Sequence, residues 1–139
     1  FGTDQEKFLV KCMEKIINEE LKQKYELIYL LRNQNHITLY TFNEGLAFEP
    51  DFIMFLANKN EDSINTYQVF IEPKGENLIT NQDSHAKQRF LDQIEEHHKI
   101  DISFSKQKFK LIGTKLFNES LTKLEFQEQI LSINSHGKT

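Results

Sequence analysis

Residues 46–56 read LAFEPDFIMFL, and residues 67–75 read YQVFIEPKG. Both segments are rich in aromatic and branched apolar residues, which favour strands. Alternate residues of a strand face opposite sides of a sheet, and in the first segment both of these sets are largely apolar, as in a central strand. The polar residues 58–65 indicate a hairpin loop between the segments, and Pro73 ends the second strand because proline cannot donate to a ladder. The sequence therefore predicts an antiparallel hairpin at the centre of a sheet.

Further elements are predicted on both sides of this hairpin. Thr3 and Glu6 match a capping box at the start of an amphipathic helix over residues 4–24. The remaining predictions are a helix end or strand over residues 25–32, a strand over 37–42, a helix over 84–98, a strand over 109–117 and a helix over 121–133. Three strands joined by short loops form an antiparallel meander, and a return through a helix places the fourth strand parallel to the third. The predicted fold class is α/β: a first helix, the meander, a crossover helix, the fourth strand and a C-terminal helix, with helices flanking a mixed sheet.

The length and composition predict a single domain over residues 1–139. A chain of 139 residues with 38% hydrophobic and 27% charged residues is typical of one globular unit. The chain begins at Phe1 rather than at Met, which suggests a fragment of a longer polypeptide. Cys12 is the only cysteine, which excludes an internal disulfide, and no apolar run approaches the ~18 residues of a membrane span. These features predict a cytoplasmic location and no membrane partner.

The distribution of charge limits how the chain could bind nucleic acid. The formal net charge of −4 argues against a free-standing module that grips nucleic acid by bulk electrostatics. Within the basic stretch over residues 99–115, Lys106, Lys108 and Lys110 are candidate DNA contacts, with a solvated lysine face as the alternative. Lys87 projects toward the apolar side of its predicted helix, where it either contacts a phosphate near the site or extends to solvent.

Three charged residues of the hairpin form a candidate catalytic group. Asp51 stands within the most apolar predicted strand, where an isolated carboxylate is costly unless it has a partner or a bound cation. Glu72 and Lys74 flank Pro73, and alternation turns both side chains to one face of the sheet. The spacing of 72 − 51 = 21 residues lets Asp51 and Glu72 come from the two strands of one hairpin. Two acidic oxygen donors suit Mg²⁺, and a neighbouring ammonium group suits phosphodiester hydrolysis.

A further carboxylate is predicted to point inward from the first helix. At ~100° per residue, Glu20 falls within the arc of Leu9, Met13 and Ile16, on the side that faces the sheet. Glu20 is therefore a candidate site residue. The alternative is a glutamate at the edge of the apolar face that simply reaches solvent.

Two short sequence motifs of the hairpin resemble a known nuclease signature. The residues PD at 50–51 followed by EPK at 72–74 resemble the motif of the PD-(D/E)xK superfamily. The order of the predicted elements is similar to the restriction-endonuclease-like core of that superfamily. The longer segments at residues 47–52 and 67–75 look like the corresponding segments in the C-terminal endonuclease domain of type III restriction enzyme Res subunits. The close resemblance covers about residues 25–94.

The resemblance implies a metal-dependent nuclease that hydrolyses phosphodiester bonds of double-stranded DNA. It implies that Mg²⁺ is the cofactor, for which Mn²⁺ can substitute. It also implies that Asp51, Glu72 and the backbone carbonyl of Pro73 bind the metal, and that Lys74 acts in catalysis.

The resemblance further implies an acid from the first helix and partners outside this chain. Glu20 is the first choice for the acid and Glu19 the alternative. Type III Res subunits carry an ATP-dependent motor on the same polypeptide and pair with a methyltransferase (Mod) subunit that recognises the DNA sequence. This chain has no GxxxxGK[ST] phosphate loop, so ATP would act only through a motor outside it. The alternatives are a non-catalytic interaction domain of the same fold, with Lys74 in a structural salt bridge, and a PD-(D/E)xK repair nuclease.

Overall fold

The computed structural model describes residues 4–34, 39–40, 47–60, 63–75, 85–92 and 108–133. The chain begins with α1 (Asp4–Ile16), which continues through a π-helical turn, η1 (Ile17–Leu21), into α2 (Lys22–Lys24). The later elements are β1 (Leu27–Arg32), β2 (Leu39–Tyr40), β3 (Ala47–Phe48), β4 (Phe52–Asn60), β5 (Ser63–Ile71), a helix over residues 85–92, β6 (Lys108–Gly113) and α5 (Lys123–Ser132). The predicted first and last helices are confirmed. None of the described helices is long and apolar enough to cross a membrane.

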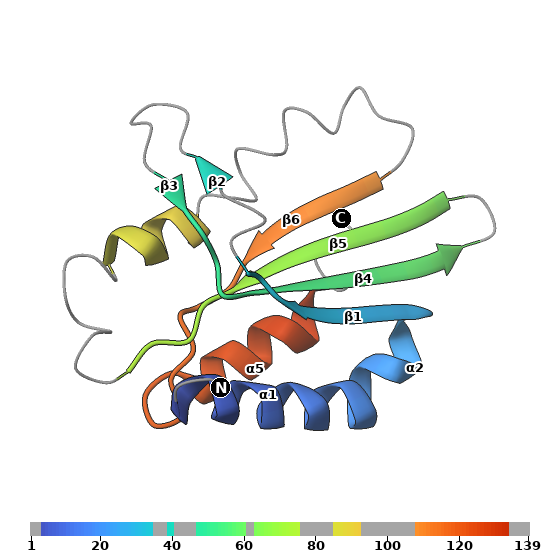
Figure 1. Cartoon of the computed structure of the whole chain (residues 1–139). Coiled ribbons are helices and arrows are strands. Elements are labelled where there is room, and N and C mark those ends of the chain that lie inside the picture. The colour runs from blue at the N-terminus through green and yellow to red at the C-terminus, as the bar shows by residue number, and fades with distance from the viewer. Residues whose placement is uncertain are drawn as a thin grey trace.

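Four strands form one mixed sheet in the order β1-β4-β5-β6 (Figure 1). β1, β4 and β5 are antiparallel, with Phe52 opposite Ile71, and β6 is parallel to β5, with Gly113 opposite Phe70. The connection from β5 to β6 contains the helix over residues 85–92, as a parallel pair requires. The predicted α/β fold, with its meander and parallel fourth strand, is confirmed.

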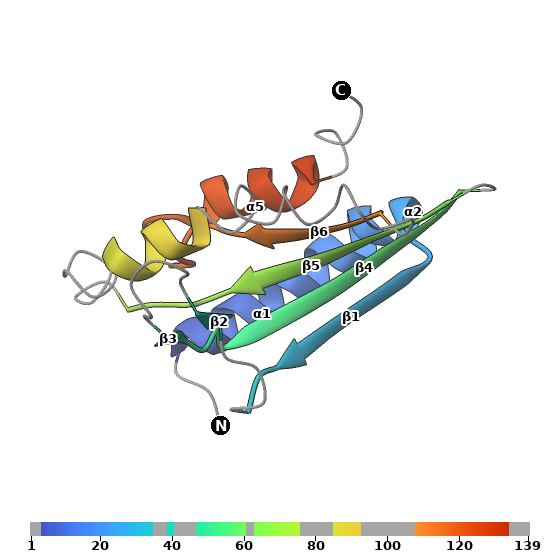
Figure 2. The ribbon, with the colours of Figure 1, turned by 90° about the horizontal axis from the view of Figure 1, so that it is seen from above.

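Helices cover both faces of the sheet, and alternation along the strands builds a core on each face. Figure 2 shows α1 running beneath the strands. The larger core lies between the sheet and the helices α1 and α5, and its fully buried strand residues are Met54, Leu56, Val69 and Ile71. The smaller core on the opposite face joins the sheet to the helix over residues 85–92 and contains Ile53, Phe70, Leu91 and Leu116. Residues two positions before or after Ile53 and Phe70 along their strands lie on the same face and therefore also face this helix.

The strand predicted over residues 46–56 is interrupted at Pro50 and Asp51. Pro50 cannot donate to a ladder, and the Asp51 N–H donates to a side chain instead of to a neighbouring strand. Residues before the interruption form β3, which pairs with β2 in a separate two-stranded sheet. Asp51 thus lies directly before β4, so the prediction that it stands in the middle of a strand is wrong.

The ends of other predicted elements also shift. The first strand of the meander is β1 and not the strand predicted over residues 37–42. Within that predicted strand the structure describes only β2, which belongs to the separate two-stranded sheet. β4 and β5 extend into the loop predicted over 58–65. The strand predicted over 109–117 ends its ladder at Gly113, after which the chain makes a single bridge between Phe117 and Pro73. The part of the crossover helix predicted beyond residue 92 lies outside the described residues.

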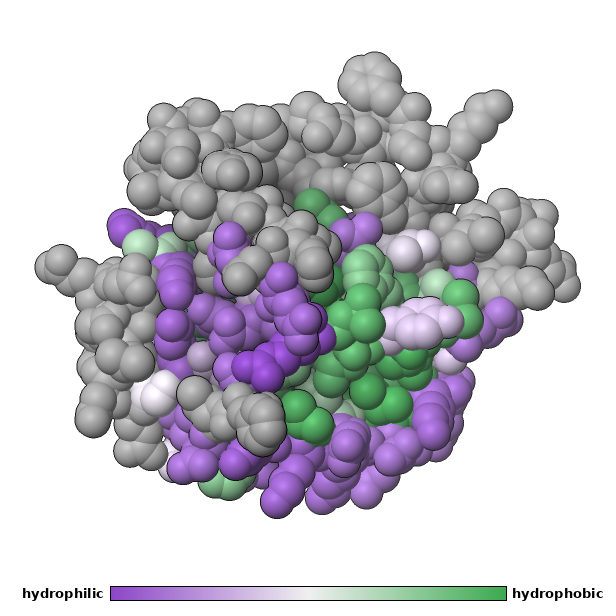
Figure 3. All heavy atoms as spheres, in the orientation of Figure 1, coloured by the Kyte–Doolittle hydropathy of each residue, from purple (hydrophilic) through white to green (hydrophobic). Residues whose placement is uncertain are grey.

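One face of the edge strand β1 is apolar and exposed. Leu27, Tyr29 and Leu31 alternate along β1, and each is more than half exposed. Figure 3 shows hydrophobic side chains gathered over the strands on the face seen in Figure 1. The sheet therefore presents an apolar surface at this edge.

Candidate active site

Asp51 and Glu72 meet at one end of the sheet. Asp51 directly precedes β4 and Glu72 directly follows β5, and these strand ends are neighbours because Phe52 lies opposite Ile71. The Asp51 N–H donates a hydrogen bond to Glu72 Oε1 at 2.9 Å. Glu72 is only 2% exposed. The structure thus brings the two predicted carboxylates together.

The backbone around Asp51 is held from the side of β1. The Asn33 N–H donates to the Asp51 carbonyl at 2.7 Å, and Asn33 Nδ2 donates to the Pro50 carbonyl at 2.9 Å. These two bonds continue the pairing of the chain beyond β1, where Pro50 cannot donate. The position of Asp51 is therefore fixed by both β1 and Glu72.

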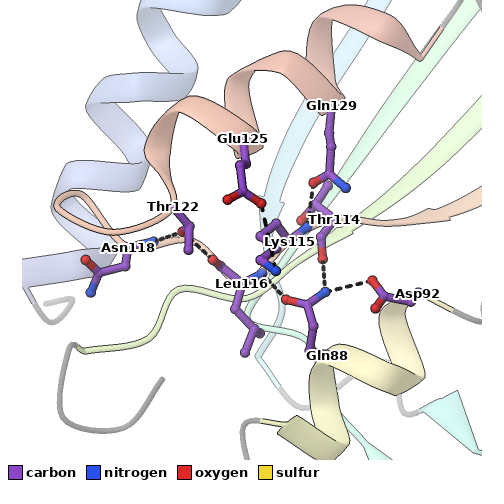
Figure 4. Close-up of polar contacts among 9 residues, drawn as sticks. All are labelled: Gln88, Asp92, Thr114, Lys115, Leu116, Asn118, Thr122, Glu125 and Gln129. Carbon is purple, nitrogen blue, oxygen red and sulfur yellow. Dashed lines mark hydrogen bonds and ion pairs between the residues drawn. The ribbon is translucent and has the colours of Figure 1, made fainter. Parts of the chain in front are cut away.

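The segment that carries Lys74 is held by the chain that follows β6. The Lys74 N–H donates to the Phe117 carbonyl, and the Phe117 N–H donates to the Glu72 carbonyl, both at 2.9 Å. Asn118 is fully buried and donates from Nδ2 to the Lys74 carbonyl at 2.9 Å, while its own N–H donates to Thr122 Oγ1 (Figure 4). Lys74 Nζ lies 3.6 Å from Glu72 Oε2. The third predicted residue thus joins the cluster.

The carbonyl of Pro73 points toward the Asp51 side of the strand. Successive backbone groups of an extended chain point to opposite sides, and those of Glu72 and Lys74 point to Phe117. The Pro73 carbonyl therefore faces away from Phe117, and it accepts no hydrogen bond from the residues that the structure describes. A carbonyl oxygen in this place is a suitable ligand for a hard cation.

Lys87 adds a second ammonium group to the cluster. Its Nζ donates a hydrogen bond to Glu72 Oε2 at 3.2 Å. Leu91, one helical turn later, is buried against Ile53 and Phe70, so the side of the helix that carries both Leu91 and Lys87 faces the sheet. The interpretation that Lys87 extends to solvent is therefore wrong. A contact between Lys87 and phosphate stays a prediction.

Gln88 fixes the helix over residues 85–92 to the chain that follows β6. Its Oε1 accepts a hydrogen bond from the Leu116 N–H at 2.7 Å, and its Nε2 donates to the Thr114 carbonyl at 3.2 Å (Figure 4). Both partners are backbone groups, so the position of the helix is set by the fold. These bonds place the neighbouring Lys87 within reach of the carboxylates.

Gly113→Ala is expected to lower the free energy of unfolding by about 2 kcal/mol, because the helix has to shift to admit a methyl group. A Cβ at Gly113 would overlap the backbone carbonyl group of Leu91. Gly75→Ala is the matched control, because no atom of the described residues lies within 4 Å of a Cβ at Gly75. Urea unfolding measures both variants, and equal stabilities would contradict this close approach.

The proximity of the two carboxylates changes the pKa of Asp51. Burial, followed by the negative charge of Glu72, raises the pKa of Asp51 from 3.8 to about 6, against the opposing charges of Lys74 and Lys87. Burial, followed by the nearby Lys87, lowers the pKa of Lys74. A divalent cation beside the two carboxylates would relieve their repulsion.

The structure does not bring Glu20 or Glu19 to the cluster. Both are exposed, whereas Leu21 is fully buried. The prediction that Glu20 faces the sheet is wrong because the π-helical turn η1 changes the phase of the helix, so that Leu21 takes the inward position. Just after the C-terminal end of α2, the Glu26 N–H donates to the Ala57 carbonyl. Ala57 lies six residues along β4 from Asp51, which corresponds to roughly 20 Å.

Glu6 is the acidic residue of α1 that lies at the Asp51 end of the sheet. Its Oε2 is 2.9 Å from Arg32 Nη2, and Arg32 ends β1 opposite Phe52, the residue after Asp51. Its side chain is largely buried. The predicted capping box paired Glu6 with Thr3, which lies outside the described residues, and so gave no indication of this position.

The lysines predicted to contact DNA from the basic stretch do not gather at the cluster. Lys108 and Lys110 lie at the start of β6, which runs parallel to β5, whereas Glu72 follows the end of β5. Lys106 lies outside the described residues. A DNA contact by Lys108 or Lys110 stays a prediction, at a distance from the carboxylates.

The oxygen donors of the cluster fit Mg²⁺. No group of three or more His, Cys, Asp or Glu side chains that could hold a metal ion occurs in the described part of the chain. Mg²⁺ is commonly held by one or two carboxylates and keeps several waters, so Asp51, Glu72 and the Pro73 carbonyl form an adequate set. Glu72 Oε2 is the oxygen for this role, because Oε1 accepts the Asp51 N–H.

Comparison with known proteins gives a family and one relative. The family model HI_1054_C, described as a C-terminal domain, matches residues 1–137. An uncharacterized protein of Haemophilus influenzae is 34% identical over 127 residues, which cover 86% of this chain and 27% of that protein. The chain thus spans about a quarter of the length of this relative. No solved structure matches the chain. The chain belongs to the HI_1054_C C-terminal domain family.

Proposed function

We propose that this domain is a Mg²⁺-dependent DNA endonuclease of the PD-(D/E)xK type and the cleavage module of a type III restriction complex. The observation that carries the proposal is the convergence of Asp51, Glu72 and Lys74 at one end of the sheet. Two acidic oxygens and an ammonium group at one point suit hydrolysis of a phosphodiester bond. The resemblance of the hairpin sequence to the nuclease motif supplies double-stranded DNA as the substrate.

Each residue of the cluster has a chemical role in this proposal. Asp51, Glu72 Oε2 and the Pro73 carbonyl hold the metal ion, which when bound supplies Lewis acidity to the scissile phosphate and to the attacking water. Lys74 places an ammonium group beside Glu72, where it stabilises negative charge that develops on the phosphate and on the attacking oxygen. The burial of Glu72 keeps these interactions from being screened by solvent.

The motor and the recognition of DNA sequence are proposed to lie outside this domain. A formal net charge of −4 favours a domain that other parts of a complex hold on DNA. The relative is much longer than this chain, which is compatible with an ATP-dependent motor on the same polypeptide. A methyltransferase (Mod) subunit would supply sequence recognition. Mn²⁺ is expected to substitute for Mg²⁺, because both accept hard oxygen ligands.

A non-catalytic interaction domain is the second candidate, and the ion pairs of Glu72 favour it. Two ammonium groups, those of Lys74 and Lys87, contact Glu72 Oε2. A buried cluster that balances its own charges can serve the fold alone. A repair nuclease of the same superfamily would share the chemistry of the first candidate and differ in its partners.

Cleavage of duplex DNA by the complex of the full-length polypeptide with its methyltransferase partner tests the proposal. Glu72→Gln is expected to abolish cleavage while ATP hydrolysis is retained, because the change removes a metal ligand. Glu119→Gln is the matched control, since Glu119 contacts Lys123 on the protein surface at 2.9 Å. Equal cleavage by the two variants would overturn the nuclease assignment and favour the interaction domain.

A further inference from the structure

The ammonium group of Lys87 contacts the carboxylate oxygen that a metal ion would need. Of the two oxygens of Glu72, Oε1 accepts the Asp51 N–H at 2.9 Å. Oε2 lies 3.2 Å from Lys87 Nζ and 3.6 Å from Lys74 Nζ. Because Glu72 is almost fully buried, its ionised carboxylate requires a positive charge at this oxygen. Lys87 makes the shorter contact of the two lysines.

Among the described residues, the charged groups of the cluster carry equal numbers of negative and positive charges before any metal ion binds. Asp51 and Glu72 supply two negative charges, and Lys74 and Lys87 supply two positive charges. A divalent cation added to these four groups would leave an excess of positive charge in a partly buried site. Electrostatics therefore favours the departure of one ammonium group from Glu72 when the cation binds.

Lys87 is the ammonium group that can leave without disturbing the fold. Its side chain is 26% exposed, compared with 19% for Lys74, so it has readier access to solvent. Its helix is held by Gln88, whose bonds to the Thr114 and Leu116 backbone do not depend on the Lys87 side chain. The flexible four-carbon stem of lysine lets the ammonium group move while the helix stays in place.

We propose that Lys87 is an exchangeable counter-ion of the candidate metal centre. Lys87 neutralises Glu72 Oε2 in the metal-free domain and gives up this oxygen when a divalent cation binds. Lys87 therefore competes with the cation and lowers its affinity. The inference rests on the proposed function, because it assumes that Asp51 and Glu72 bind a metal ion.

Isothermal titration calorimetry with Mn²⁺ alone, on the full-length polypeptide without nucleotide, tests this competition. The part of the binding heat that is lost in Asp51→Asn is assigned to Mn²⁺ binding at the Asp51–Glu72 cluster. Lys87→Met is expected to bind Mn²⁺ about tenfold more tightly than the wild-type protein, because the competing ammonium group is gone. Arg89→Met is the matched control, since Arg89 is exposed on the same helix, and its affinity is expected to change less than about twofold.

The possible outcomes separate this inference from the proposed function. If the signal depends on Asp51 but Lys87→Met binds Mn²⁺ no more tightly than wild type, the exchange is overturned and the proposed function stands. If Asp51→Asn changes the signal in neither the wild-type nor the Lys87→Met background, the proposed function is overturned as well. Thermal melts report folding, and Lys87→Gln, which keeps a polar end near Glu72, replaces Lys87→Met if that variant does not fold.

Discussion

Asp51→Asn is expected to reduce DNA cleavage by the full complex about a thousandfold, because a neutral amide is a poorer Mg²⁺ ligand than a carboxylate. Asparagine has nearly the same size as aspartate, and the bond from the backbone N–H of residue 51 to Glu72 Oε1 is retained. The loss of cleavage would therefore reflect the missing charge rather than a displaced strand. Cleavage is measured with duplex DNA, and unchanged ATP hydrolysis would show that the proposed motor is intact.

The same replacement is expected to stabilise the metal-free protein at neutral and alkaline pH. The pKa of Asp51 is raised from 3.8 to about 6 by burial and by Glu72, in a cluster that also contains Lys74 and Lys87, so the folded protein binds this proton more tightly than the unfolded chain. The free energy of unfolding therefore falls as the pH rises from about 4 to about 6. Above about pH 6 this decrease in the free energy of unfolding is complete. It amounts to on the order of 1–2 kcal/mol after allowance for solvent screening.

Thermal and urea unfolding at two pH values measure this effect. Asp51→Asn lacks the ionisation, so its advantage over the wild-type protein should be absent near about pH 4 and complete near about pH 8. A purely structural ion cluster gives the opposite sign, because loss of the Asp51 charge would leave an ammonium group without its partner. A variant that is less stable than wild type at about pH 8 would support the structural interpretation.

Lys74→Met is expected to lose cleavage by at least about a hundredfold and to keep Mn²⁺ binding, because in the proposed function the ammonium group acts on the phosphate and the attacking water. Methionine keeps the apolar stem, and Lys87 still neutralises Glu72 at 3.2 Å. Lys115→Met is the matched control, since Lys115 lies 3.8 Å from the exposed Glu125. Equal cleavage rates in the two variants would contradict a catalytic role for Lys74.

The central hairpin and its carboxylates could be predicted because they depend on short-range sequence. Alternation along β4 and β5 fixes their register, and that register places Asp51 beside Glu72 whatever the rest of the chain does. Lys74 follows two residues after Glu72 and shares its face for the same reason. The interruption at Pro50 also had a local signal, since proline is poorly accepted in a central strand.

Glu20 was misplaced because one π-helical turn changes the phase of a helix. Buried residues of α1 follow one another at short helical intervals up to Ile16, and the next buried residue is Leu21, five positions later. Glu19 and Glu20 stand where a regular α-helix would next face the sheet. Ile17 is partly buried against the same core and precedes Leu21 by four residues, so the apolar spacing of the sequence gives no signal of the π-helical turn.

Lys87 and Glu6 could not be placed because they belong to elements whose position depends on packing between distant segments. Lys87 reaches Glu72 only because its helix approaches β6 closely at Gly113, which periodicity does not reveal. The pairing of Lys87 with the buried Leu91 at i, i+4 was the available signal. Glu6 depends on Arg32 at the end of β1, a segment whose sequence left helix and strand both open.

Calorimetric titration of Mn²⁺ into wild-type and Asp51→Asn protein tests most directly whether Asp51 and Glu72 form a metal centre. The contacts around Glu72 and the raised pKa of Asp51 lead us to expect a binding signal in the wild-type protein that Asp51→Asn loses. Titrations that are identical for the two proteins would contradict the metal centre, and with it the nuclease function that we propose.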